Sequence, residues 1–224
     1  MSKKFNLNLV MQGKGGVGKS LISNMLMQYY MYKRKVDVIG FDVDAEQNTL
    51  SEWFNNKVIT VDIVNPELDD IDKDKFYDFV ELVTKNNNKN IAVDVGTSIS
   101  KSFLAFLKEL NVLTILNDLF NINVFSIVTA DENTVKYLKN IFAFNQPAHV
   151  FKNEYFGEVN YDTEYTFFKL HDLNKRPVKK VLENKIHYTD INNTKNLHVI
   201  EKAYASYMYK HYFDQFDKIF QAGE

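Results

Sequence analysis

The chain has 224 residues, of which 45% are hydrophobic and 25% charged, and its formal net charge is −2 at pH 7. This balance is typical of a globular protein. It argues against a protein dominated by nucleic-acid binding, although it is compatible with a local basic patch. The sequence contains no cysteine, which excludes disulfides, thiolate zinc sites, iron–sulfur clusters and cysteine nucleophiles. No apolar stretch reaches the roughly 20 residues that span a bilayer, and no signal peptide is visible, so a soluble, cytoplasmic protein is expected.

Short apolar stretches alternate with longer stretches of helical period, which indicates βαβ units and a mostly parallel sheet. Strands are predicted at residues 7–12, 36–41, 58–64, 90–95, 124–128 and 149–151. Helices are predicted at residues 19–33, 76–84, 102–119, 134–144 and 199–220, the last of them long and amphipathic. Residues 157–196 give no clear pattern. The expected fold class is α/β, with a mostly parallel, doubly wound sheet flanked by helices, and residues 1–224 are expected to form a single domain.

The strongest motif follows the first predicted strand. Residues 13–20, Gly-Lys-Gly-Gly-Val-Gly-Lys-Ser, match the phosphate-binding pattern G-x-x-x-x-G-K-[ST] without a mismatch. Glycines let successive backbone N–H groups converge on phosphate oxygens, and the following helix directs its positive N-terminal end at the same anion. Lys19 is expected to bridge the β- and γ-phosphates, and the Ser20 hydroxyl to ligate Mg²⁺. The residues expected to hold the nucleotide here are Gly13, Gly15, Gly16, Val17, Gly18, Lys19 and Ser20.

Carboxylates stand at the ends of two more predicted strands. Asp42 and Asp44 follow the second strand, and Asp94 ends the strand at residues 90–95, shortly before Gly96. In parallel sheets, ligands bind beside the carboxyl ends of the strands. Asp94 therefore has the form of a Walker B carboxylate that holds Mg²⁺ through water. Gly96 is expected to offer its backbone N–H to the γ-phosphate and to flex between nucleotide states.

Lys14, directly after the first glycine, makes the loop similar to the deviant Walker A motif of the partition and septum-site ATPases, the ParA/MinD class. The resemblance implies a three-layer P-loop NTPase fold of the SIMIBI type. It also implies that Lys14 reaches the partner's phosphates in an ATP-sandwich dimer, where it acts like an arginine finger. By the same resemblance, Asp44 would position or activate the attacking water, and Asp42 would lie near the Mg²⁺ shell. The alternatives are an exposed loop lysine at Lys14, a helix cap at Asp44, and a loop support at Asp42.

Two further segments resemble a subgroup of small plasmid ATPases associated with conjugation and plasmid stability, the TraL/StbC-like proteins. Residues 94–98, Asp-Val-Gly-Thr-Ser, depart from the Asp-Thr-Pro-Pro pattern common in the class, and residues 153–157 read Asn-Glu-Tyr-Phe-Gly. In the class, an asparagine after the last strand recognises adenine, so Asn153 is the expected base-binding residue. The sequence has no Asn-Lys-x-Asp guanine motif, which favours ATP over GTP.

The resemblance implies an ATPase whose cofactors are ATP or ADP and Mg²⁺. It would be a dimerisation switch that hydrolyses ATP slowly and acts in plasmid partition, stability or conjugative transfer. Its partners would be a second copy of the chain, in an ATP-dependent homodimer, and a protein that stimulates hydrolysis. A maturation or phosphoryl-transfer enzyme of the same superfamily, and a scaffold that binds ATP without turnover, are the alternatives.

Two segments indicate whether the chain contacts DNA or a membrane. Residues 175–180, Lys-Arg-Pro-Val-Lys-Lys, leave non-specific DNA contact open, with a solvated turn as the alternative. The predicted helix at residues 199–220 balances acidic and basic side chains, unlike the basic membrane-binding tail of septum-site relatives. No stable membrane anchor is therefore expected.

Overall fold

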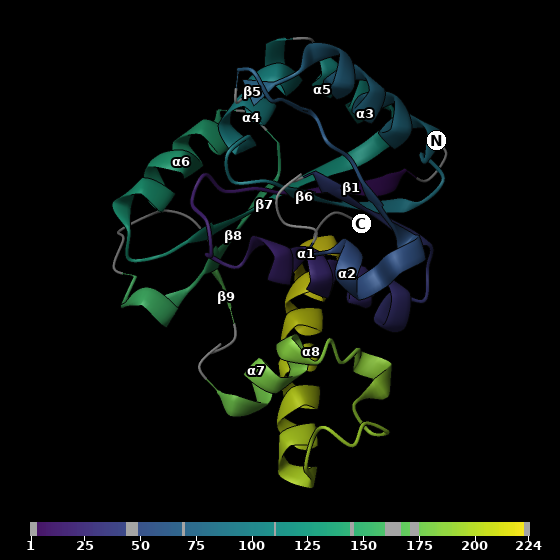
Figure 1. The fold of residues 1–224 in the computed structure, drawn as a ribbon, viewed down its shortest axis with the longest axis vertical. Coiled ribbons are helices and arrows are strands. Elements are labelled where there is room, and N and C mark those ends of the chain that lie inside the picture. The colour runs from purple at the N-terminus through teal and green to yellow at the C-terminus, as the bar shows by residue number, and fades with distance from the viewer. Residues whose placement is uncertain are drawn as a thin grey trace.

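The structure is a computed structural model that describes residues 4–43, 49–68, 70–109, 111–143, 146–159, 167–170 and 175–221. Within these ranges a seven-stranded sheet runs in the order β3-β2-β6-β1-β7-β8-β9, and every neighbouring pair is parallel. Its strands are β1 Phe5–Val10, β2 Val38–Val43, β3 Val58–Thr60, β6 Asn90–Val95, β7 Phe120–Val128, β8 Ala148–Lys152 and β9 Phe167–Lys169. Helices lie on both faces of this sheet (Figure 1). The predicted three-layer α/β fold is confirmed.

The helices divide between the two faces (Figure 1). One face carries α3 Lys73–Lys85, α4 Ser100–Glu109, α5 Val112–Leu119 and α6 Glu132–Phe142. The other carries α1 Lys19–Gln28, its π-helical continuation η1 Tyr29–Arg34, α2 Ser51–Phe54 and α8 Val199–Gln221, with α7 Arg176–Glu183 packed on α8. The remaining elements are short: η2 Asn55–Lys57, the antiparallel pair β4 Val64–Asn65 and β5 Asp70–Ile71, η3 Glu154–Phe156 and η4 Tyr188–Asp190.

The sheet separates two hydrophobic cores because successive side chains of a strand point to opposite faces. In β1, Leu7 and Leu9 pack with the helices α3 to α6, whereas Val10 packs with α1 and α8. Each core is closed by the apolar faces of its helices. Because β1 runs parallel to β6, and β6 runs parallel to β2, the loop after β1 lies at the carboxyl edge of the sheet, beside the end of β6.

The last helix, α8, has 23 residues and confirms the helix predicted at residues 199–220. Its Phe216 ring lies 5.5 Å from the ring centroid of Tyr29, and its Phe220 ring lies 5.7 Å from the same centroid. The Tyr209 hydroxyl donates to the carbonyl oxygen of Ile186 over 2.5 Å. The apolar side of α8 is therefore part of the core. Among the residues described, no helix is both long and apolar enough to cross a membrane.

Some predicted elements differ from the structure. The predicted helix at residues 102–119 is two helices, α4 and α5, and Asn111 between them has a left-handed φ of 54°. The predicted strand at residues 58–64 ends at Thr60, since the chain then leaves the sheet edge toward the β4–β5 pair. Residues 175–180 are not a turn, because Arg176 begins α7 with a proline in its first turn, where proline is tolerated.

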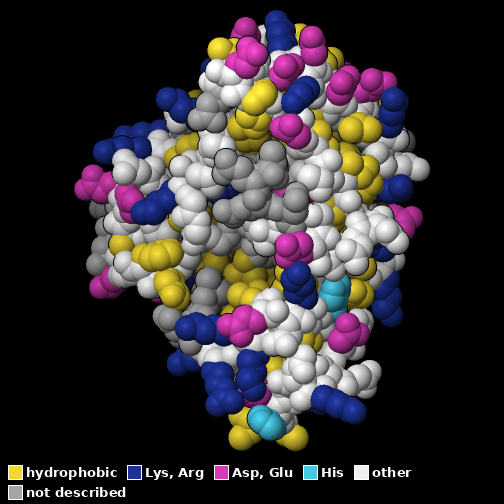
Figure 2. Space-filling view, viewed as in Figure 1, with side chains coloured by type: hydrophobic (Ala, Val, Ile, Leu, Met, Phe, Trp, Pro, Cys, Tyr) yellow, Lys and Arg dark blue, Asp and Glu magenta, His cyan; other side chains and the backbone are white. Residues whose placement is uncertain are grey.

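Lys and Arg side chains gather on the lower part of the face drawn in Figure 2, where Figure 1 places α7 and the start of α8. Two of the cations of α7 are held by one carboxylate: Arg176 Nε lies 3.2 Å and Lys180 Nζ 2.8 Å from the Glu201 oxygens. These pairs tie α7 to α8. Contact of this basic segment with DNA stays a prediction.

Candidate functional site

The phosphate-binding loop connects β1 to α1. Gly16 and Gly18 adopt positive φ angles of 70° and 110°, which glycine reaches without a steric penalty. Gly18 is the residue before α1, and a Cβ added there would lie 2.8 Å from Cδ2 of Leu170. The backbone conformation therefore favours glycine at position 18, and a Cβ there would also require the Leu170 side chain to move.

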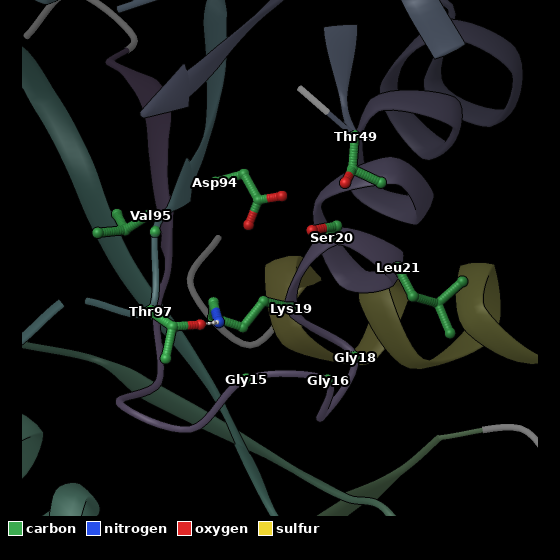
Figure 3. Close-up of a pocket in the computed structure, with 11 residues that line it drawn as sticks. Gly15, Gly16, Gly18, Lys19, Ser20, Leu21, Thr49, Asp94, Val95 and Thr97 are labelled. Atoms are coloured by element: carbon green, nitrogen blue, oxygen red, sulfur yellow. Dashed lines mark hydrogen bonds between the residues drawn. The ribbon is translucent and has the colours of Figure 1, made fainter. Parts of the chain in front are cut away.

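A cavity of about 280 Å³ opens beside this loop. Figure 3 shows its side chains coming from the loop, from the start of α1, from the end of β6 and from Thr49. Its lining residues are Gly15, Gly16, Gly18, Lys19, Ser20, Leu21, Thr49, Asp94, Val95, Gly96 and Thr97. The structure thus brings the phosphate-binding loop and the Walker B segment to one site. Gly13, Lys14, Val17, Asp42 and Asn153 do not line it.

Lys19 is buried, with 8% of its surface exposed, and its Nζ donates to Oγ1 of Thr97 over 2.5 Å (Figure 3). Thr97 lies just after β6 in the predicted switch, and its contact with Lys19 is not predicted from the sequence. The Gly96 N–H, predicted to contact the γ-phosphate, donates to the carbonyl oxygen of Val43 over 2.9 Å. The predicted contact of Gly96 with phosphate would require that bond to open.

Asp94 is a buried carboxylate at the end of β6, and burial is the main reason that its pKa is raised to about 7. The neighbouring Asp42 raises this pKa further, while Ser20 and Lys19 act against the shift. The Oδ1 atom of Asp94 has no hydrogen-bond partner among the described residues. Figure 3 shows Asp94 and Ser20 at the same side of the cavity. A buried carboxylate oxygen beside a hydroxyl is a suitable ligand set for Mg²⁺ and its water molecules, so these residues fit the predicted ion.

Asp42 lies beside Asp94 in the sheet and is 1% exposed. Its Oδ2 accepts hydrogen bonds from the backbone N–H groups of Leu50 (3.0 Å) and Ser51 (3.2 Å). Asp42 therefore supports the start of α2, and its role near the Mg²⁺ shell stays a prediction. Asp44, the predicted catalytic carboxylate, falls within residues 44–48, which lie outside the described ranges.

Lys14 forms an ion pair with Asp131, the residue that caps the N-terminus of α6. The pKa of Asp131 lies below its usual range, mainly because its carboxylate accepts a hydrogen bond from the Lys14 ammonium. The backbone N–H of Asn133 also donates to this carboxylate and lowers the pKa further. The side chains of the pair are 41% and 31% exposed. Lys14 therefore lies outside the cavity with a partner from its own chain. In the sequence, the only signal for Asp131 is its position as a cap before a predicted helix.

Two buried amides fix the ends of the loop. Oε1 of Gln12 accepts from the N–H of Gly13 over 2.8 Å, and Nε2 of Gln12 donates to the carbonyl oxygen of Ile127 over 2.6 Å. Nδ2 of Asn153 donates to the carbonyl oxygen of Val17 over 2.8 Å. Gln12 is not among the predicted site residues, although a polar residue at the end of an apolar strand is a signal for it. Asn153 anchors the loop in this structure, and its recognition of adenine stays a prediction.

Comparison with known proteins identifies related sequences. The sequence profile described as "CobQ/CobB/MinD/ParA nucleotide binding domain" matches residues 9–174. Two Escherichia coli proteins, both named Protein TraL, are 24% and 25% identical to the chain over 185 residues, which cover 79% of this chain and 75% of each relative. The predicted resemblance to the ParA/MinD class and to TraL-like proteins is confirmed.

Solved structures with a similar arrangement include a putative plasmid partition protein from Borrelia burgdorferi B31 bound to AMPPNP. It is 15% identical, with a TM-score of 0.48, over 96% of this chain and 99% of that chain. The MinC:MinD cell division protein complex of Aquifex aeolicus is 17% identical, with a TM-score of 0.42, over 66% and 68% of the two chains. Since the profile match spans the phosphate-binding loop, the Walker B strand and Asn153, this chain belongs to the CobQ/CobB/MinD/ParA nucleotide binding domain family.

Proposed function

We propose that this chain is an ATPase that binds ATP with Mg²⁺, closes with a second copy of itself while ATP is bound, and separates after slow hydrolysis. The observation that carries this proposal is the different placement of the two loop lysines. Lys19 is buried in the cavity, whereas Lys14 lies outside it, partly exposed, and is held by Asp131. This difference supports a role for Lys19 at the chain's own nucleotide and a role for Lys14 at the nucleotide of a second copy.

Nucleotide binding would draw on groups that are already close together. The backbone N–H groups of residues 13–20 and the N-terminus of α1 attract phosphate, and Lys19 would exchange its bond to Thr97 for a phosphate oxygen. Ser20 and Asp94 would hold the Mg²⁺, which neutralises charge on the β- and γ-phosphates when it is bound. This arrangement supports the binding of a nucleoside triphosphate.

Hydrolysis would use residues from two copies. Asp44 would orient or activate the attacking water, and Lys14 of the second copy would stabilise the charge that develops on the transferred phosphoryl group. Lys14 would leave Asp131 when it does so, and the ion pair therefore favours the separated state. A partner protein that accelerates hydrolysis would act on this step.

The relation to the TraL proteins, together with the segments at residues 94–98 and 153–157, supports a role in conjugative transfer or in plasmid partition or stability. Residues 1–224 would act in that role as a single domain. The basic segment that begins α7 would be the place for any contact with DNA.

The test is the mass of the protein in solution, measured by light scattering with Mg²⁺ plus ATP or ADP. The Asp44→Ala variant should hydrolyse ATP more slowly and so keep it bound. The double variant Asp44→Ala/Lys14→Ala also removes the lysine that would reach the second copy. Asp44→Ala/Lys139→Ala is the matched control, because Lys139 is an exposed lysine of α6 outside the cavity. We expect a dimer with ATP only, lost without Lys14 and kept without Lys139.

Asp44→Ala protein that binds ATP and stays monomeric would contradict the proposed dimer. ATP turnover of the wild type distinguishes a switch from a scaffold. If Asp44→Ala hydrolyses ATP as fast as the wild type, the role assigned to Asp44 is wrong. If neither protein hydrolyses ATP even though both dimerise, the chain is a nucleotide-dependent scaffold.

A further inference from the structure

The short helix α2 begins beside the nucleotide cavity and ends against a histidine from a distant part of the chain. Thr49, which precedes the helix, lines the cavity, and Figure 3 shows its side chain on the Ser20 side of it. Trp53 and Phe54 are the last two residues of α2, and Trp53 lies about 6 Å further along the helix axis than Thr49 at the usual rise per residue. Because α2 is a single turn, a displacement at its start also moves its end.

The histidine at the end of α2 is His187, the residue before η4. Its Nε2 lies 3.1 Å from the carbonyl oxygen of Trp53, which can only accept, so Nε2 carries a proton and donates it. In the neutral ring Nδ1 then accepts from the hydroxyl of Tyr32, over 2.9 Å. Two residues earlier, Lys185 Nζ lies 2.8 Å from a carboxylate oxygen of Glu52 in α2. The segment at residues 185–187 therefore holds the end of α2 through directional contacts.

The start of α2 is connected by hydrogen bonds to the segment that follows β6. The N–H of Gly96 donates to the carbonyl oxygen of Val43 at the end of β2, over 2.9 Å. The preceding residue, Asp42, accepts from the N–H groups of Leu50 and Ser51 at the start of α2. The predicted contact of Gly96 with the γ-phosphate would open the bond to Val43. The strand end that positions α2 would then lose one of the bonds that fix it.

His187 is not part of the nucleotide site itself, since it does not line the cavity. It also belongs to no group of His, Asp and Glu side chains, among the residues described, that could hold a metal ion. Its ring packs instead on the aromatic side chains at the end of α2, with the ring centroid of Phe54 5.1 Å away. This contact is made in the arrangement in which Gly96 is bonded to Val43. A contact that is made in only one of two arrangements stabilises that arrangement relative to the other.

From these observations we infer that the contact between His187 and α2 is autoinhibitory. It holds α2 in the arrangement in which the bond between Gly96 and Val43 is closed, and it therefore lowers the affinity of the site for a nucleotide that has a γ-phosphate. Loss of the contact should tighten the binding of ATP but not of ADP, because ADP has no γ-phosphate for Gly96 to contact. The inference rests on the nucleotide binding of the proposed function and adds a regulatory contact outside the cavity.

The test uses the full chain carrying Lys14→Ala as the parent, in which the proposed dimer does not form, so that binding is measured on a single copy. Calorimetry with Mg²⁺ gives the Kd of a non-hydrolysable ATP analogue and of ADP. We expect His187→Ala to lower the Kd of the analogue by about three- to ten-fold and that of ADP by less than about two-fold. His198→Ala is the matched control at an exposed position before α8, and it should change neither Kd by more than about two-fold.

Trp53 is the only tryptophan of the chain, so its fluorescence reports on α2, and the ATP analogue should change its emission more than ADP does.

A second variant, Tyr32→Phe, removes only the hydroxyl that binds Nδ1 of His187 and should lower the Kd of the analogue by about two-fold. Folded His187→Ala protein that binds the analogue no more tightly than the parent would overturn the inference, as would an equal gain for ADP. If His187→Ala does not fold, an unchanged Kd in Tyr32→Phe overturns it. Trp53 emission that both nucleotides change equally would also count against it. A parent protein that binds neither nucleotide would instead refute the proposed function on which the inference rests.

Discussion

Replacing Asp94 by asparagine is expected to stabilise the nucleotide-free protein. The carboxylate is buried at the end of β6, and its Oδ1 has no hydrogen-bond partner among the described residues. Burial is the largest cause of a pKa raised to about 7, and the charge of Asp42 adds to it. An acid whose folded-state pKa exceeds its unfolded value destabilises the folded state when it is ionised. The substitution removes this ionised group and keeps the shape of the side chain.

The size of the effect follows from the pKa shift. From 3.8 to about 7 is about three pH units, and each unit corresponds to about 1.4 kcal/mol, so ionisation destabilises the fold by about 4 kcal/mol. The introduced amide is itself polar and buried, which offsets about half of this gain and leaves about 2 kcal/mol at pH 8. For a chain of this length, 1 kcal/mol changes Tm by about 2–4 °C, so Tm should rise by about 4–8 °C.

The pH dependence has a definite sign. Between about pH 4 and pH 7 the folded protein keeps the Asp94 proton and the unfolded chain has lost it, so wild-type stability falls as pH rises through this window. Above pH 7 both states are ionised and the penalty is constant. The advantage of Asp94→Asn over the wild type should therefore be near zero at pH 5 and complete at pH 8.

Thermal unfolding followed by circular dichroism, in EDTA and without nucleotide, measures this difference at pH 5 and pH 8. Asp78→Asn is the control, because it makes the same chemical change at an exposed position of α3. Its Tm should match the wild type at both pH values. If Asp94→Asn melts below the wild type at pH 8, or differs from it equally at both pH values, the buried carboxylate is not the destabilising group.

Three other substitutions test contacts seen in the structure. Asp131→Asn should raise the fraction of dimer formed with a non-hydrolysable ATP analogue, by about two- to five-fold in light scattering, because Lys14 loses its partner within the chain; an unchanged fraction would contradict this. Asn153→Ala should weaken ATP binding by about ten-fold in a fluorescent-nucleotide titration; a matching loss for GTP would indicate an effect on the loop and not on the base. Tyr209→Phe should lower the free energy of unfolding by about 1–3 kcal/mol in urea, since the carbonyl of Ile186 loses its donor; a neutral result would show that water replaces the hydroxyl.

The elements that could be predicted are those with a strong local pattern. The strand predicted at residues 90–95 coincides with β6, which is buried along its whole length. The strand predicted at residues 124–128 is the second half of β7, because Asn121 and Asn123 interrupt the apolar pattern of the first half. The break between α4 and α5 rests on one left-handed asparagine, a conformation that the residue type allows but does not require. β9 has three residues, and its formation depends on pairing with β8.

The residues of the candidate site also differ in how well the sequence predicts them. The loop residues are predictable because the glycines and Lys19 form one local motif, and the carboxyl edge of the sheet brings Asp94 to it. The partners of the two lysines are not predictable in this way. Thr97 and Asp131 come from distant parts of the chain, and their approach to Lys19 and Lys14 depends on packing. Asp42 shows the limit of a resemblance, since the same carboxylate that was expected near Mg²⁺ also holds the backbone of Leu50.

The buried charges around this cavity predict that ligand binding and stability are coupled there. Lys19 and Asp94 are both buried beside the same cavity, and Asp42 adds a second carboxylate next to Asp94. Removing such charges from water destabilises the folded chain unless they are compensated. In the proposed complex a phosphate group would compensate Lys19 and a divalent cation would compensate Asp94, so neither ligand alone would compensate both charges. Nucleotide and cation should therefore bind more tightly together than separately, and a ligand that binds only the folded chain stabilises it in proportion to its affinity.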